Sequence, residues 1–210
     1  MKRFDIITET DARTLARGEV VELSARGHIT PLAHDTLRDL GVTVLREGRT
    51  SDADASLAPP ADIQSVAIAS DHTGIALRRT LTTWLRGRGL AVNDMGTEGP
   101  DAVDYPDIAA NVARAVARKE ADGGIVIDGA GIGSAIAANK IKGVRAVMAA
   151  SETIARYARE HNGANVLTLG ATLVSADEAK AIVGVWLTTP MREARYIRRL
   201  AKIRDLEKEG

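Results

Sequence analysis

The sequence predicts an α/β fold in which a parallel sheet is covered by helices on both faces. Two observations support this: strand and helix patterns alternate along most of the chain, and the strand segments are apolar throughout. Strands that are buried on both faces have this character, whereas strands with one solvated face alternate. A polar segment with two adjacent prolines, residues 48–62, is expected to link an N-terminal lobe (1–47) to a larger domain (63–210).

Capping residues and apolar periodicity give the expected elements. In the lobe, strands at 20–23 and 42–45 flank a helix that begins at Thr30 and Pro31 and ends at Gly41. In the larger domain, strands are expected at 66–69, 90–95, 124–127, 144–149 and 166–169, and helices at 74–86 and 106–120. A capping box at 175–178 begins another helix. The last helix is expected to begin at Thr189 and Pro190 and to bury Tyr196, Leu200, Ile203 and Leu206.

The composition excludes several classes of protein. The 210-residue chain has no cysteine, a formal net charge of zero and only 3% aromatic residues. Disulfides and thiolate nucleophiles are therefore excluded, and a base-stacking surface for nucleic acid is not expected. No apolar run approaches the roughly 20 residues of a membrane span, and the N-terminus becomes polar too early for a signal peptide. We expect a cytoplasmic protein with no nucleic-acid or membrane partner.

A glycine-rich turn is the most informative segment. The strand GIVID ends at Asp128 and runs into Gly129, Gly131 and Gly133, and a helix opens at Ser134. Such a junction gathers backbone N–H groups that can hold an anion or a developing oxyanion. Asp128 is then expected to face a ligand as a candidate base. A purely structural turn, a helix cap at Asp128 and a dinucleotide site are the alternatives.

Other polar groups are expected at the same edge of the sheet, where ligands bind in folds of this kind. Asp71 and His72 follow the first strand of the larger domain, and His161 and Asn162 precede the last one. Either histidine alone is more often structural. In the last helix, Arg195 and Arg199 are four residues apart, so they share a face and suit phosphate recognition. A solvated basic face is the alternative.

Four motifs carry a family resemblance across roughly residues 63–207: VAIASDHTGIALRRTL, DYPDIA, GGIVIDGAGIGSAIAANKIKGVRAV and AREHNGANVLTLGA. Together they resemble the type B ribose-5-phosphate isomerase family, which includes the galactose-6-phosphate isomerase subunits. The resemblance implies a three-layer α/β/α sandwich with a five-stranded parallel, Rossmann-like sheet. It also implies a homodimer with shared active sites, a phosphorylated sugar as substrate, and neither a cofactor nor a metal.

The resemblance also implies roles for individual residues. Asp71 lines the sugar site, and His161 assists ring opening. Proton transfer is assigned to Asp128 as a hypothesis from its place at the strand end beside the turn. The sugar and its enediolate are contacted by His72, Tyr105, Gly129, Gly131, Gly133, Ser134 and Asn162. The phosphate is bound by Arg195 and Arg199, usually across the dimer interface, with His72 close by.

Four positions depart from the family pattern. Asp128 stands where many members have a cysteine base, and Ser134 where others have a glutamate. Ala130 replaces a threonine or serine of the turn, and Thr172 replaces a phosphate-binding arginine. A carboxylate can act as the base if it is aimed at the carbon acid and shielded from water. These departures suggest an altered substrate or a lost activity.

The leading hypothesis is therefore a cofactor-independent aldose–ketose isomerase of a phosphorylated sugar, such as ribose 5-phosphate. The alternative is a non-catalytic sugar-phosphate-binding or microcompartment accessory protein. In the lobe, GHITPLAHDTLRDLGVTVL resembles short modules of enzymes encoded with bacterial microcompartments. This hints at a shell or enzyme partner and at a location inside a microcompartment. An oligomerisation or packing appendage is the alternative for the lobe.

Overall fold

A computed structural model describes residues 2–46, 56–99, 101–191 and 193–209. The chain forms two compact units. The sheet unit is Asp62–Thr189, and the lobe unit combines Met1–Ala61 with Pro190–Gly210. The C-terminal residues thus make their contacts with the lobe, whereas the sequence suggested a larger domain that continues to residue 210. Most of the predicted linker, residues 48–55, lies outside the described residues.

The sheet unit contains five parallel strands in the order β5-β4-β6-β8-β7. Their bounds are β4 (Ser65–Ser70), β5 (Ala91–Asp94), β6 (Gly123–Asp128), β7 (Ala146–Met148) and β8 (Val166–Gly170). Each lies within a residue or two of its prediction. The chain passes from β4 to β5 on one side and from β6 toward β7 and β8 on the other. Where the strand order changes direction in this way, a crevice forms at the carboxyl ends of the two central strands, β4 and β6.

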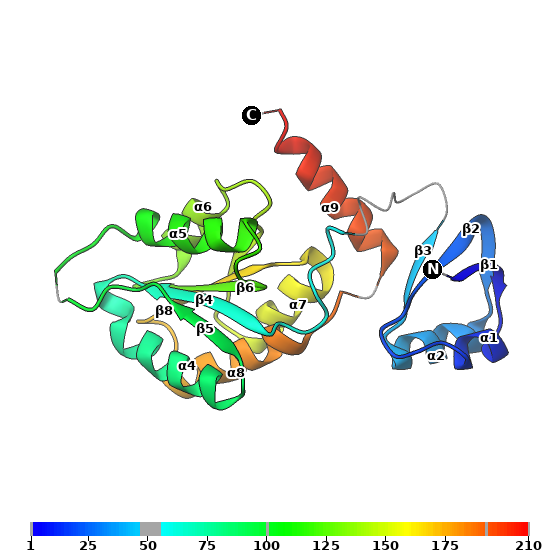
Figure 1. The fold of residues 1–210 in the computed structure, drawn as a ribbon, viewed down its shortest axis with the longest axis horizontal. Helices are drawn as coiled ribbons and strands as arrows, with labels where there is room; N and C mark the ends of the chain where they lie inside the picture. The colour runs from blue at the N-terminus through cyan, green and yellow to red at the C-terminus, as the bar shows by residue number, and fades with distance from the viewer. Residues whose placement is uncertain (1, 47–55, 100, 192, 210) are drawn as a thin grey trace. The chain divides into compact units, whose positions relative to one another are not determined.

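Helices cover both faces of this sheet, as predicted (Figure 1). One face packs against α4 (Ile75–Gly87), α7 (Glu152–Asn162) and α8 (Ala176–Thr188). The other packs against α5 (Tyr105–Ala117) and α6 (Ile132–Ala138). The predicted capping box of α8 is present, with Ser175 and Glu178 bonding each other's backbone N–H groups. The result is a three-layer α/β/α sandwich.

The lobe unit has its own small parallel sheet, in the order β1-β2-β3. Its elements are β1 (Lys2–Ile7), α1 (Glu9–Arg13), β2 (Val20–Ile29), α2 (Pro31–Leu40) and β3 (Thr43–Arg46). Gly41 ends α2 in the left-handed conformation, φ 67°, as a helix C-cap favours. The prediction missed β1 and α1, because β1 is mostly exposed and α1 is only five residues long.

The last helix, α9 (Ala194–Leu206), begins later than predicted. Glu193 forms an isolated parallel bridge with Val44 of β3, so the backbone just before the helix is extended. The predicted buried face of this helix is only partly correct. Tyr196 and Leu200 are buried, but Ile203 is 41% exposed and Leu206 is 64% exposed.

The sheet unit offers a test of its packing at Gly123, where β6 begins. A Cβ atom added there would lie 2.5 Å from the ring of Trp186, which is fully buried in α8. We expect Gly123→Ala to lower the free energy of unfolding by about 1–3 kcal/mol in urea denaturation, because the ring has no room to retreat. Gly87→Ala is the control, since its Cβ would meet nothing within 4 Å. Equal stability of the two variants would contradict this packing.

Candidate active site

The carboxyl ends of β4 and β6 bring two carboxylates to one edge of the sheet. The last residue of β4, Ser70, is paired with Ile127, and the backbone N–H of Asp71 donates to the carbonyl of Ile127 at 3.1 Å. Asp128, the next residue of β6, is paired with Gly170 of β8. Both carboxylates are largely buried, with exposed fractions of 6% for Asp71 and 5% for Asp128. The predicted convergence of these two side chains is therefore present.

Asp128 uses both carboxylate oxygens within the turn. Oδ1 accepts hydrogen bonds from the N–H of Ala130 at 2.8 Å and from the N–H of Gly131. Oδ2 accepts from the N–H of Ser134 at 3.1 Å and from the Ser134 hydroxyl. A carboxylate has about four acceptor positions, and all four are filled. The sequence suggested that these N–H groups stand ready for a ligand, but three of them already bind Asp128.

Two threonines hold the glycine-rich turn in place: Thr168 in β8, and Thr172 just after that strand. The hydroxyl of Thr168 donates to the carbonyl of Gly131 at 2.6 Å, and that of Thr172 donates to the carbonyl of Gly129 at 2.6 Å. Gly131 has φ 76°, and a Cβ there would lie 2.8 Å from the backbone of Leu169. Sequence reasoning treated Thr172 only as a missing arginine and did not consider Thr168. Their role was not visible because it depends on pairing between distant strands.

Asp71 is bound differently. Its Oδ1 accepts from the N–H and hydroxyl of Thr73 at 2.9 Å and 2.6 Å, and from the N–H of Gly74 at 3.2 Å. These bonds cap the short helix His72–Gly74. Its Oδ2 accepts no hydrogen bond from any residue that the structure describes. Asp71 therefore keeps one carboxylate oxygen available at the edge of the sheet.

Tyr105 and His72 complete the predicted site residues at this edge. A Cβ added to Gly133 would lie 2.5 Å from the Tyr105 ring, so the phenol lies directly against the turn. Tyr105 is 42% exposed, and His72 is also exposed. Thr73 lies close to the turn: a Cβ atom added to Gly129 would be 3.9 Å from the Thr73 hydroxyl. The edge thus combines two buried carboxylates with exposed polar groups that a sugar could contact.

His161 and Asn162 lie at the opposite edge of the sheet. They end α7, and the next residues reach the start of the strands: the Asn165 side chain accepts from the N–H of Arg145, just before β7, at 2.8 Å. The Asn165 carbonyl accepts from the N–H of Gly124, at the start of β6, at 2.9 Å. A six-residue strand separates the two edges by roughly 17 Å. The prediction that both histidines share one edge is therefore wrong within one chain.

Arg195 and Arg199 are on α9, in the lobe unit. Arg195 forms an ion pair with Glu193 at 2.6 Å and donates to the Tyr196 hydroxyl at 3.0 Å. The hydrogen bond to Tyr196, and secondly the charge of Glu193, raise the pKa of the Arg195 guanidinium. Arg199 has no acidic partner among the described residues. The approach of these arginines to a sugar phosphate remains a prediction.

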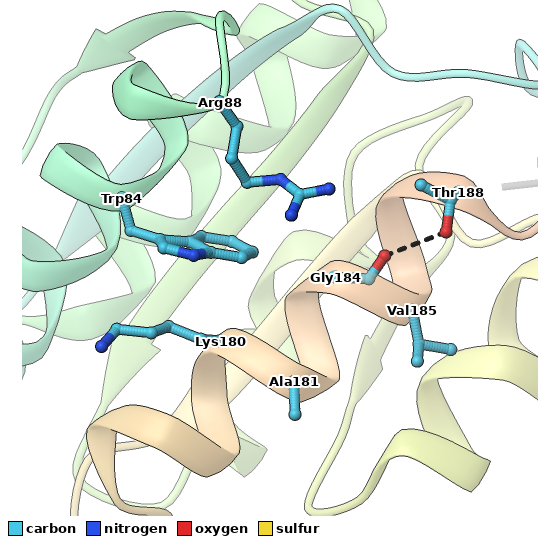
Figure 2. A pocket seen from close by; sticks show the side chains of 7 residues that line it. All are labelled: Trp84, Arg88, Lys180, Ala181, Gly184, Val185 and Thr188. Atoms are coloured by element: carbon cyan, nitrogen blue, oxygen red, sulfur yellow. Dashed lines mark hydrogen bonds between the residues drawn. The ribbon is translucent and has the colours of Figure 1, made fainter.

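A groove on the outer helix layer is distinct from this site. It lies between α4 and α8, has a volume of about 440 Å³ and is lined by Trp84, Arg88, Lys180, Ala181, Gly184, Val185 and Thr188 (Figure 2). Its cations already have neighbours, because Lys180 pairs with Asp177 at 3.0 Å and Arg88 lies over the Trp84 ring. None of the predicted site residues lines it. The groove is therefore separate from the predicted site residues.

Two kinds of feature are absent from the described residues. No helix there combines the length and apolar character that crossing a bilayer requires. No group of three or more histidine, cysteine, aspartate or glutamate side chains is arranged there to hold a metal ion.

Comparison with known proteins agrees with this geometry. The family described as Ribose/Galactose Isomerase matches residues 66–203. Ribose-5-phosphate isomerase B of Escherichia coli is 40% identical over 145 residues, which are 69% of this chain and 97% of that protein. D-erythrulose-4-phosphate isomerase of Pectobacterium atrosepticum is 38% identical over 125 residues, 59% of this chain and 82% of that protein. The N-terminal part of the lobe unit, residues 1–61, lies outside the matched family segment.

Solved structures give the same result. Ribose-5-phosphate isomerase B of Clostridium thermocellum has a TM-score of 0.68 and 45% sequence identity, covering 69% of this chain and 98% of that one. The enzyme of Mycoplasma genitalium, solved with bound ribulose 5-phosphate, has a TM-score of 0.67 and 41% identity, covering 70% and 97%. A family match over most of the chain, relatives near 40% identity and a shared parallel sheet lead to one conclusion: this chain belongs to the ribose/galactose isomerase family.

Proposed function

We propose that this protein interconverts an aldose phosphate and a ketose phosphate through an enediolate, without a cofactor. The observation that supports this most directly is the pair of buried carboxylates, Asp71 and Asp128, at the carboxyl ends of adjacent strands beside a glycine-rich turn. Membership of the family and relatives named as isomerases of five-carbon and four-carbon sugar phosphates support the same reaction. Both substrate sizes therefore belong in the test.

The reaction moves one proton between neighbouring carbons. A base removes the proton from C2 of the open-chain aldose, and the electron pair shifts so that the carbonyl oxygen at C1 becomes an enediolate oxygen. A proton then moves from O2 to O1, and return of the carbon-bound proton to C1 gives the ketose. A carboxylate suits this task when it is held within hydrogen-bond reach of the carbon-bound proton and shielded from water.

Asp128 is the proposed base, and its hydrogen bonds define a requirement. One of the two hydrogen bonds to Oδ2 must break before this oxygen can take a proton. The Ser134 hydroxyl is the donor that can be released most easily, because a hydroxyl rotates without moving the backbone, whereas the N–H donors are fixed. Ser134 would thus control access to the base. Asp71, with its available Oδ2, is the alternative base.

A second copy of the chain is proposed to complete the site. His161 and Asn162 lie at the wrong edge to reach Asp128 of their own chain, so only a partner can supply them for ring opening. The helices on either side of edge strand β7 carry exposed apolar side chains: Ile132 and Ile136 on α6, Ile154 and Tyr157 on α7. These fit burial against another protomer. Arg195 and Arg199 are the proposed phosphate ligands.

The cytoplasm is the proposed location. A microcompartment partner for the lobe remains a prediction based on the short resemblance of residues 27–45.

The structural role of Asp128 can be tested separately from its chemistry. We expect Asp128→Asn to lower the free energy of unfolding by about 1–3 kcal/mol, because an amide nitrogen would face the buried N–H of Ser134 and leave it unsatisfied. Asp71→Asn is the matched control, since its amide oxygen can still accept all three bonds of Oδ1. Urea denaturation measures both. A stable Asp128→Asn variant would show that the turn does not need the charge.

The same two variants identify the base. Wild-type protein is incubated in deuterated water with ribose 5-phosphate and with erythrulose 4-phosphate, and deuterium is expected at C2 of the aldose or C1 of the ketose. Per folded molecule, Asp128→Asn is expected to lower kcat at least ~100-fold. If instead Asp71→Asn abolishes exchange while Asp128→Asn retains it, the base is Asp71. Binding of the sugar phosphates without exchange would support the accessory-protein alternative.

Mixing inactive variants tests the shared site. Asp128→Asn and His161→Ala homodimers are mixed, dissociated and reassociated. In each heterodimer, one of the two sites then combines Asp128 from the His161→Ala chain with His161 from the Asp128→Asn chain, and the other site lacks both residues. We expect about a quarter of the wild-type activity to return, from statistical mixing into a twofold dimer. Sedimentation confirms the oligomeric state. If activity stays absent while heterodimers form, His161 does not complete its partner's site.

A further inference from the structure

The N-terminal lobe is attached to the helix that carries Arg195 and Arg199. The family match begins at residue 66, so the lobe is an addition to the matched segment. In the lobe unit, β3 and α9 pack together, and Glu193 at the start of α9 pairs with Val44 of β3. An added structure therefore holds the helix with the proposed phosphate ligands.

Tyr196 links that packing to the two guanidiniums. It is 5% exposed and belongs to the buried cluster formed by Leu45, Met191, Tyr196, Ile197 and Leu200. Its ring lies 4.9 Å from the guanidinium carbon of Arg195 and 5.7 Å from that of Arg199. Its hydroxyl accepts from Nη2 of Arg195 at 3.0 Å. One buried side chain therefore contacts both arginines.

Apart from Tyr196, Arg195 is restrained by its ion pair with Glu193 at 2.6 Å. Both arginines are exposed, and Arg199, which lies over the Tyr196 ring, has no ion pair among the described residues. An exposed arginine samples many rotamers, and ordering it on binding costs free energy. A ring that both guanidiniums stack on reduces this cost, because it restricts them before the ligand arrives.

We infer that the lobe is a positioning module for phosphate binding: Leu45 of β3 fixes Tyr196, and Tyr196 orients Arg195 and Arg199. This rests on the proposed function, in which these arginines bind the phosphate. Tyr196 and Leu45 are positioning residues and need not touch the substrate. The inference gives the lobe a task in the reaction of its own chain, independent of any outside partner.

The test measures phosphate affinity in the full-length protein. Calorimetric titration gives the dissociation constant for inorganic phosphate, and steady-state assays with ribose 5-phosphate and erythrulose 4-phosphate give KM and kcat. Leu45→Ala and Tyr196→Leu are expected to weaken phosphate binding and raise KM about fivefold, with kcat changed less than about twofold. Tyr196→Phe keeps the ring and removes the hydroxyl that accepts from Arg195, so its effect is expected to be about twofold.

Two further variants separate the possible failures. Leu37 is buried like Leu45, but it belongs to the core of the lobe sheet with α1 and α2 and not to the Tyr196 cluster. We expect Leu37→Ala to leave phosphate affinity unchanged. If it weakens binding as much as Leu45→Ala, general loosening of the lobe explains the effect and the inference is overturned. Arg199→Ala tests the underlying assignment.

The outcomes of the arginine variant are distinct. If Arg199→Ala weakens phosphate binding but Leu45→Ala and Tyr196→Leu do not, the phosphate assignment stands and the positioning role is wrong. If Arg199→Ala and Arg195→Ala both leave phosphate affinity unchanged, α9 does not bind the phosphate, and the inference fails together with that part of the proposed function. Because phosphate binding is measured directly, either result is obtained even without turnover.

Discussion

The site depends on one carboxylate that holds a loop together. Asp128 accepts three backbone N–H groups and one hydroxyl within six residues of itself, and this fixes the path from β6 into α6. The threonines of β8 and its following loop secure the carbonyls of the same turn from the other side. The position of Tyr105 against Gly133 follows from this fixed loop. A group that stabilises the loop so extensively is constrained in its chemistry, because its charge is already shared among four donors.

This arrangement relates the unusual residues of the chain to one another. Asp128 and Ser134 occupy the two positions at which the resemblance led us to expect alternative bases, and here they are hydrogen-bonded to each other. Thr172, at the position of an expected arginine, braces Gly129. Ala130, the fourth departure, donates its N–H to Asp128 in the same turn. The departures from the family pattern are therefore not independent, since all four meet at a single turn.

The fold of the sheet unit was predictable because continuous apolar strands and helix caps are local signals. The edge of the sheet at which Asp71 and Asp128 lie followed from strand direction alone. The location of His161 did not, because a residue just before a strand lies at the amino end of that strand, at the edge opposite Asp71. The full occupancy of Asp128 and the packing of Tyr196 on the lobe depend on tertiary contacts, which no local pattern reports. Exposed β1 gave no signal of burial at all.

The lobe unit is discontinuous along the chain, since residues 190–210 return to join residues 1–61. During synthesis, the first part of the lobe leaves the ribosome long before α9 exists, and the side of Leu45 that α9 covers stays open to water in the meantime. The intervening sheet unit is contiguous and can collapse first. The core of the lobe around Leu45 therefore cannot close until the arginine-bearing helix has been made.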